Sequence, residues 1–379
     1  MNPATRNLHD RGQRLWLDNI TRDLLGSGTL ARYVAEYSVT GLTSNPTIFE
    51  QAIASGSAYD EAIRSLAARG LSPQELFFEL ALQDLTQAAD LFRPIFDASG
   101  GADGWVSLEV SPLLADDSTQ TAQAAVQLHG RAARPNLFIK IPGTPEGIAA
   151  IEQSIFDGVP INVTLLFSRE HHAAAAQAYL RAIERRVRAG LDPRVESVAS
   201  LFVSRWDAAV KPLTGPHLHN RLGIAIAMQT YQAYCKLLAS ERWQRLAAAG
   251  ARPQRLLWAS TGSKDAAVAD TFYVDALVAA GTITTIPEKT LLAFADHGQA
   301  GAGLPADGGD APAVLDVFGH AGVDVQALAQ RLQHEGVQAF ARSWAGLMAC
   351  VRQKSASPPR GAGAAGAAGE KINDSERLA

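Results

Sequence analysis

The sequence predicts an α/β protein, a (β/α)8 TIM-type barrel of parallel strands with additional helices. Three observations predict it. Short apolar runs of strand length recur along the chain, longer segments with helical periodicity separate them, and 379 residues are enough for eight such strand–helix units. A doubly wound open sheet is the alternative, but eight candidate strands favour the closed barrel.

The lengths of these continuous apolar runs fit strands that are buried on both faces, and several runs are rich in β-branched residues. They cover residues 15–20, 41–44, 105–110, 137–141, 161–166, 195–202, 256–260 and 282–286.

Helical patterns lie between these runs. In residues 75–96 apolar side chains recur every three or four positions, which places them on one helical face. Residues 223–249 form a second long pattern, and Gly250 follows it where a left-handed cap is expected. Residues 323–352 form a third.

The composition is that of a globular protein, with 47% hydrophobic and 19% charged residues. A formal net charge of −4 gives no reason to expect nucleic acid or an anionic membrane as a partner. Two cysteines and a polar N-terminus without a secretory signal favour the cytoplasm. We expect one catalytic domain over residues 1–354. A low-complexity tail over 355–379 is expected to be disordered.

Polar residues lie near the ends of the predicted strands. In a closed barrel the chemistry occupies the C-terminal ends of the strands, so side chains placed there converge at one mouth. The residues concerned are Asp18, Asn45, Glu109, Lys140, Asn162, Thr164, Ser200 and Arg205.

Lys140 stands inside the apolar run LFIKI, and lysine is rarely buried without a partner. A free lysine amine titrates near pH ~10.4, and an apolar surround disfavours its charged form. A neutral amine can attack a carbonyl and form a Schiff base, which gives Lys140 a chemical use.

Several of these residues could also have a purely structural role, without any part in catalysis. Lys140 could be an edge residue whose amine reaches solvent, and Asn45, before a proline, could be a turn residue. Glu109 could end a surface strand, and Arg205 could pair with Asp207 or a neighbouring carboxylate. These readings do not explain why polar groups recur at the same end of so many strands.

Several blocks together resemble the transaldolase family, in that family's order and over most of residues 10–350. The blocks are GLTSNPTIFEQAI (41–53), VSLEVSP (106–112), LFIKIPGTPEGIAAIE (137–152), GVPINVTLLFS (158–168), SVASLFVSRWD (197–207), LLWASTGSKD (256–265) and TITTIPEKTLLAFADHG (282–298).

The resemblance implies an enzyme of the pentose phosphate pathway that moves a dihydroxyacetone unit between sugar phosphates. Lys140 would form the Schiff base. Glu109 would act as acid and base through a water held partly by Thr164, and Asp18 would take the C4-hydroxyl proton during cleavage.

The same resemblance implies the substrate contacts. Asn45 and Asn162 match amides that hold the dihydroxyacetone hydroxyls, Ser200 matches a substrate-contacting hydroxyl, and Arg205 matches a phosphate ligand. The family's second arginine is missing from ASTGSKD, where Lys264 is the expected replacement.

The alternative within the superfamily is a fructose 6-phosphate aldolase, a branch that tends to have Gln in place of Glu109 and Tyr in place of Phe202. Both residues here favour transaldolase. A second alternative is a sugar-phosphate-binding barrel without turnover. For the transaldolase reading we expect no cofactor beyond the covalent Schiff base on Lys140, sugar phosphates as partners, and a monomer or homodimer.

Overall fold

The predicted parallel strands are all present. The structure is a computed structural model that describes residues 1–263 and 265–356. Eight strands in this part of the chain pair in parallel in the order β2-β1-β8-β7-β6-β5-β4-β3. They are β1 (Arg14–Asp18), β2 (Val39–Thr43), β3 (Val106–Glu109), β4 (Leu137–Pro142), β5 (Ile161–Leu166), β6 (Ser197–Phe202), β7 (Arg255–Ala259) and β8 (Ile283–Ile286).

The barrel closes between β2 and the residues just before β3. Gly41 and Trp105 form a parallel bridge, and the backbone amide of Leu42 donates to the carbonyl of Trp105 at 2.9 Å. A Cβ on Gly41 would lie 2.6 Å from the Trp105 carbonyl oxygen, so only glycine permits this approach. The closed parallel barrel predicted from the sequence is therefore confirmed.

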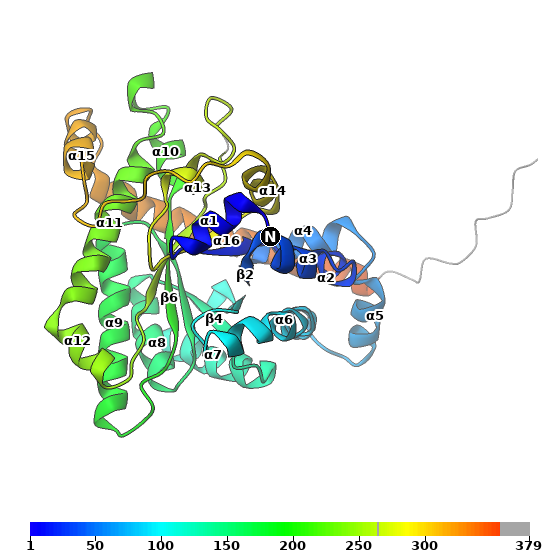
Figure 1. Cartoon of the computed structure of the whole chain (residues 1–379). Coiled ribbons are helices and arrows are strands. Elements are labelled where there is room, and N and C mark those ends of the chain that lie inside the picture. The colour runs from blue at the N-terminus through cyan, green and yellow to red at the C-terminus, as the bar shows by residue number, and fades with distance from the viewer. Residues whose placement is uncertain (264, 357–379) are drawn as a thin grey trace, which may run out of the picture.

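Helices surround the barrel and extend from it at both termini (Figure 1). They are α1 (Pro3–Asp10), α2 (Arg22–Gly26), α3 (Thr29–Tyr37), α4 (Pro46–Ser55), α5 (Asp60–Ala68), α6 (Pro73–Ala98), α7 (Ser118–Ala132), α8 (Pro145–Phe156), α9 (Arg169–Arg188), α10 (Ser204–Val210), α11 (Leu222–Ala239), α12 (Glu241–Ala248), α13 (Phe272–Ala276), α14 (Glu288–His297), α15 (Ala311–His320) and α16 (Val325–Ala356), with 3-10 turns η1 (Pro112–Leu114) and η2 (Pro216–Leu218).

Two of the long helical patterns are single helices, and one is not. The patterns at 75–96 and 323–352 correspond to α6 and α16. The pattern at 223–249 is broken at Ser240, whose backbone is extended and whose hydroxyl caps α12 by accepting from the amide of Trp243. The expectation of one helix there was wrong, because a capping serine ends α11 and begins α12 without interrupting the apolar periodicity.

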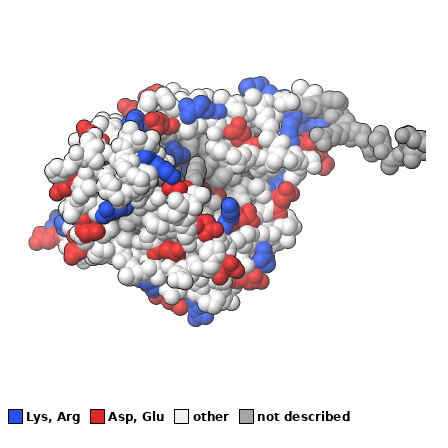
Figure 2. All heavy atoms as spheres, turned by 90° about the horizontal axis from the view of Figure 1, so that it is seen from above, with Lys and Arg blue, Asp and Glu red and all other residues white. Residues whose placement is uncertain are grey.

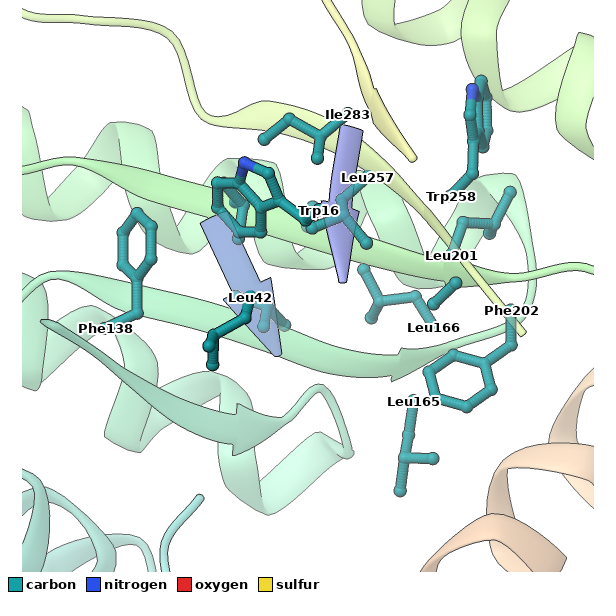
Figure 3. Packing of buried hydrophobic residues seen from close by; sticks show 14 of the residues in the cluster. Trp16, Leu42, Phe138, Leu165, Leu166, Leu201, Phe202, Leu257, Trp258 and Ile283 are labelled. Atoms are coloured by element: carbon teal, nitrogen blue, oxygen red, sulfur yellow. The ribbon is translucent and has the colours of Figure 1, made fainter. Parts of the chain in front are cut away.

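Aromatic side chains fill the barrel interior next to the level of Asp18 and Lys140, toward the amino ends of the strands. Trp16 and Phe138 lie with ring centroids 6.2 Å apart, and Phe138 stacks on Trp105 at 4.1 Å. Figure 3 shows Trp16 and Phe138 as neighbours inside the barrel. Asp18 and Lys140 follow these rings two residues later on the same strand faces, so the aromatic packing fixes the floor beneath them.

The tail predicted over residues 355–379 lies almost wholly outside the part of the chain that the structure describes, which ends at residue 356. Within the residues described, no helix combines the length and apolarity that crossing a bilayer requires.

Candidate active site

Strand register brings the central predicted residues to one level of the barrel. Glu109 on β3 is paired with Lys140 on β4, and Lys140 is paired with Asn162 on β5. On the other side of the barrel, Asp18 on β1 is paired with Thr43 on β2. Side chains from strands far apart in sequence thus meet because parallel pairing aligns their carboxyl ends.

Lys140 is buried, with 5% of its surface exposed. Its stem runs along the apolar strand, whereas its amine has polar neighbours. Nζ lies 3.5 Å from Glu109 Oε2 and donates to the backbone carbonyl of Ser44 at 3.0 Å. The ring centroid of Phe340 on α16 lies 5.8 Å from the same nitrogen. The amine therefore faces the barrel interior and not bulk solvent.

Glu109 is equally buried, and desolvation raises its pKa to about 7, against the lowering effect of Lys140. Its two carboxyl oxygens and the hydroxyl of Thr164 are buried without a hydrogen-bond partner among the described residues. Buried polar groups are normally satisfied by protein or ordered water. A carboxyl group with a pKa near 7 can both give and accept a proton at neutral pH.

Asp18 has a different setting, although it too is buried deeply enough to raise its pKa. The hydroxyl of Thr43 donates to Asp18 Oδ1 at 2.8 Å, and Thr285 Oγ1 lies 2.8 Å from Thr43 Oγ1. Because Thr43 uses its single proton on Asp18, Thr285 donates to Thr43. This chain of hydroxyls and the nearby Lys140 favour the carboxylate form, opposing the burial.

The two predicted asparagines are held differently. Asn45 caps α4, because its side-chain oxygen accepts from the amide of Ile48 at 3.1 Å. The structural role expected for an asparagine before a proline is therefore present for this oxygen. The same side chain lines the cavity, and its amide nitrogen has no hydrogen bond to a described residue. Asn162 accepts from Ser200 Oγ at 2.7 Å and donates to Ser107 Oγ at 3.2 Å, which fixes its amide across three strands.

These groups surround a cavity of about 230 Å³ at the mouth of the barrel. The face of the molecule that carries α10, α13 and α14 is hollowed near its middle, and acidic and basic side chains are interspersed around it (Figure 2). Predicted residues lining the cavity are Asp18, Asn45, Lys140, Thr164, Ser200, Phe202 and Arg205. Glu109 and Asn162 are not part of this lining but contact it through Lys140 and Ser200.

Arg205 begins α10 just beyond β6, with its guanidinium carbon 5.3 Å from the ring centroid of Phe202. It forms no ion pair with any carboxylate of the described residues. The structural reading, a pair with Asp207, is wrong. Asp207 instead accepts from the backbone amide of Leu222 and from the hydroxyl of Tyr273. Burial lowers the pKa of the Arg205 guanidinium.

Lys264, the predicted second phosphate contact, lies outside the described residues. No group of three or more histidine, cysteine, aspartate or glutamate side chains within residues 1–263 and 265–356 is arranged to hold a metal ion.

Sequence reasoning missed several residues that line the cavity: Thr43, Thr47, Ile48, Ala259, Ser260, Thr285 and Phe340. Ser260 follows β7 directly, so the strand-end rule that selected Glu109 would also have selected it. Phe340 had no such signal, because nothing in the periodicity of α16 distinguishes a residue over the barrel mouth from one in the core.

Comparisons with known proteins agree with this geometry. The sequence profile of the Transaldolase/Fructose-6-phosphate aldolase family matches residues 15–351. The Transaldolase of Frankia alni is 43% identical over 362 residues, covering 93% of this chain and 97% of its own. The Transaldolase of Thermobifida fusca is 44% identical over 366 residues (94% and 100%), and that of Thiobacillus denitrificans is 43% identical over 355 residues (92% and 99%). The chain therefore belongs to the transaldolase/fructose-6-phosphate aldolase family.

Proposed function

We propose that the protein is a transaldolase. It transfers a dihydroxyacetone unit from sedoheptulose 7-phosphate to glyceraldehyde 3-phosphate, giving erythrose 4-phosphate and fructose 6-phosphate. One observation carries the proposal: a buried lysine amine lies beside a carboxyl group of raised pKa, at a cavity that a second carboxyl group also lines. The relatives named Transaldolase, similar over nearly their whole length, support it.

The first half of the reaction forms and uses a Schiff base. Lys140 Nζ attacks the C2 carbonyl of the donor, and loss of water leaves an iminium between Nζ and C2. Glu109 gives and takes the protons of this step, and its pKa near 7 suits both directions. We propose that a water bridges Glu109 and Thr164, whose buried oxygens have no hydrogen-bond partner among the described residues.

The second half moves the three-carbon unit. Asp18 takes the proton of the C4 hydroxyl, the C3–C4 bond breaks, and its electron pair passes toward Nζ to give a neutral enamine. The aldose phosphate leaves. The enamine C3 then attacks the aldehyde of the acceptor, Asp18 returns its proton to the new hydroxyl, and water releases the product from Lys140. The hydroxyl of Thr43 holds the Asp18 carboxylate in place for both transfers.

The substrate is positioned by two asparagine amides and by cationic side chains that bind its phosphate. Asn45 has its oxygen committed to the helix cap, which leaves its N–H groups to donate to dihydroxyacetone hydroxyls. Ser200 and Asn162 form the opposite wall. Arg205, which lines the cavity without an ion pair to a described residue, binds the phosphate as a planar fork of donors. Lys264 is proposed as the second phosphate contact on its sequence position alone.

Phe202 separates this function from the aldolase alternative. It lines the cavity with an apolar ring, where a tyrosine would place a proton donor beside the enamine. Without that donor the enamine waits for an acceptor aldehyde.

We further propose that the barrel of residues 1–354 is a single catalytic domain that works in the cytoplasm, as a monomer or homodimer, without a cofactor. Both cysteines, Cys235 and Cys350, are free thiols, which suits a reducing compartment. The iminium on Lys140 supplies the electron sink that a cofactor would otherwise provide.

A coupled transfer assay tests the proposal. Fructose 6-phosphate and erythrose 4-phosphate are supplied, and formation of glyceraldehyde 3-phosphate is followed for the native protein, Lys140→Ala and Lys236→Ala. Lys236 is an exposed lysine on α11 and serves as the control. We expect Lys140→Ala to fold but to lose at least about three orders of magnitude in rate, since the covalent route is gone. Near-native transfer by Lys140→Ala would refute the nucleophile.

A further inference from the structure

The C-terminal helix supplies one side chain to the active-site cavity. In Figure 1, α16 runs from the side of α15 toward α5. It packs on α4, α5, α6, η1 and β5. Phe340 is the α16 residue that lines the cavity; it is 6% exposed, and its ring centroid lies 5.8 Å from Lys140 Nζ.

The position of Phe340 is fixed by contacts on both sides of it along the helix. Seven residues earlier, the Gln333 amide donates to the backbone carbonyls of Gly143 and Leu165, both at 3.0 Å. At Gly336 a Cβ would lie 2.9 Å from Leu165 Cδ2, so the absence of a side chain lets the helix approach β5. Four residues later, Trp344 packs edge-on against Phe77 at 5.1 Å. These positions recur at three- or four-residue spacing and form one helix face.

The same helix face contacts a residue with strained backbone, Leu165, through Gln333 and Gly336. Leu165 has a φ of 58°, in the left-handed region that side-chain-bearing residues rarely adopt, and it follows Thr164 directly. Figure 3 shows Leu165 and Phe202 together at one end of the barrel. Phe340 and Phe202 thus bring aromatic rings to the cavity from two different elements, a helix and a strand.

An apolar ring beside Lys140 has a specific consequence for the three-carbon intermediate. If a proton from water reaches enamine C3, the C2–C3 electron pair forms a C3–H bond and the nitrogen becomes an iminium again. A second water then adds to C2, the C2–Nζ bond breaks, and free dihydroxyacetone leaves with Lys140 regenerated. A side chain that cannot donate a proton, and that occupies the space where a water would lie, suppresses the first of these steps.

We propose that Phe340 is a specificity-determining residue that retains the dihydroxyacetone unit for transfer by excluding water from the enamine. The inference rests on the proposed transaldolase function, and extends it to a residue of the C-terminal helix. The ring also faces Nζ at a separation within cation–π range, which favours the iminium before cleavage and after addition.

The test compares the two fates of the intermediate. Native protein, Phe340→Leu, Phe340→Ala and a control are given fructose 6-phosphate without acceptor, and free dihydroxyacetone is measured. The transfer rate is measured separately with erythrose 4-phosphate. The control is Phe318→Leu, which changes a fully buried phenylalanine on α15, outside the cavity. Borohydride trapping on Lys140 is run for every protein.

We expect the ratio of release to transfer to rise about tenfold in Phe340→Ala, the effect of about 1.4 kcal/mol between the two barriers. A smaller rise is expected in Phe340→Leu, which keeps part of the apolar volume. Phe318→Leu should keep the native ratio. If Phe340→Ala does not fold, the ratio in Phe340→Leu decides the question.

An unchanged ratio in the Phe340 variants that fold would overturn the inference, including the case in which release and transfer fall together. Failure of the proposed function looks different, because then the native protein itself would give no borohydride adduct on Lys140 or, as an aldolase, would release dihydroxyacetone without transferring it to erythrose 4-phosphate.

Discussion

Two carboxyl groups at the same barrel mouth differ in what surrounds them. Burial raises the pKa of Asp18, and the Thr43 hydroxyl and the nearby Lys140 oppose that effect. Glu109 has no hydrogen-bonding hydroxyl, and burial raises its pKa to about 7. The two carboxyl groups therefore differ in the contacts that favour their charged forms, and unlike surroundings are what divides acid and base roles between two carboxyl groups.

This difference predicts a pH dependence. Glu109 is protonated below about pH 7 and ionised above it. Because attack by Lys140 needs a base to accept its proton, we expect kcat/KM to rise as the pH increases through about 7. Glu109→Gln should lose this ionisation and about two orders of magnitude in rate. The measurement is the pH profile of kcat/KM for transfer.

Glu241→Gln, which alters an exposed glutamate on α12, is the control and should keep the native profile. A Glu109→Gln profile that still rises through pH 7 would show that another group is responsible.

The ionisable residues and the two amides of the site were predictable from residues near strand ends, whereas half of the cavity lining was missed for physical reasons. Lys140 was found because a charged group in a buried strand demands an explanation, and Glu109 and Asp18 because they end predicted strands. The support of Asp18 by Thr43 and Thr285 depends on pairing between β1, β2 and β8, which a single sequence does not reveal. Phe340 depends on the path of α16 across the mouth, which only tertiary structure fixes.

At the scale of elements, the strands were easier to predict than the helix ends. Each apolar run became a strand because a parallel barrel buries both of its faces. The break at Ser240 was missed because a capping serine is also tolerated inside a helix, and only the extended backbone reveals it. The helix α16 was predicted, but its role at the barrel mouth was not.

The attachment of α16 gives a prediction at this scale. In Gln333→Leu, the carbonyls of Gly143 and Leu165 lose their donor while the helix still covers them. Leaving buried carbonyls unsatisfied costs about 1–3 kcal/mol, so we expect the free energy of unfolding to fall by about that amount. We also expect transfer to slow, because Thr164 precedes Leu165. Denaturant unfolding and the transfer assay measure the two effects.

Gln338→Leu, at an exposed position of the same helix, should change the free energy of unfolding by less than about 0.5 kcal/mol. Equal effects of the two substitutions would mean that the hydrogen bonds of Gln333 do not hold α16 in place.

For the whole molecule, the closed barrel followed from counting strands and helices, whereas the contact that closes it did not. The bridge between Gly41 and Trp105 joins the first and last strands of the sheet order, and no local pattern marks it. The aromatic floor of Trp16 and Phe138 depends on that closure, because their side chains meet across the lumen.

Stability at low pH is a property of the whole fold. His172 on α9 is 2% exposed, packs edge-on against Tyr234 on α11, and its burial lowers the pKa to about 4 from 6.5. Between these values the unfolded chain binds a proton that the folded chain does not. The free energy of unfolding therefore falls as the pH drops below about 6.5.

As the pH falls from 7 to 5, we expect the protonation of His172 in the unfolded chain to lower the free energy of unfolding by about 2 kcal/mol. The variant His172→Leu should lack this contribution. Denaturant unfolding of the native protein and the variant at both pH values measures it. His320→Leu, which changes an exposed histidine on α15, controls for histidine removal in general. The same pH slope in the native protein and in His172→Leu would contradict the assignment.

The role of Lys140 as the nucleophile is tested by borohydride reduction of the native protein in the presence of fructose 6-phosphate, followed by peptide mass analysis. We expect a stable three-carbon adduct, derived from dihydroxyacetone, on Lys140. Absence of an adduct, or an adduct on another lysine with Lys140 unmodified, would contradict it.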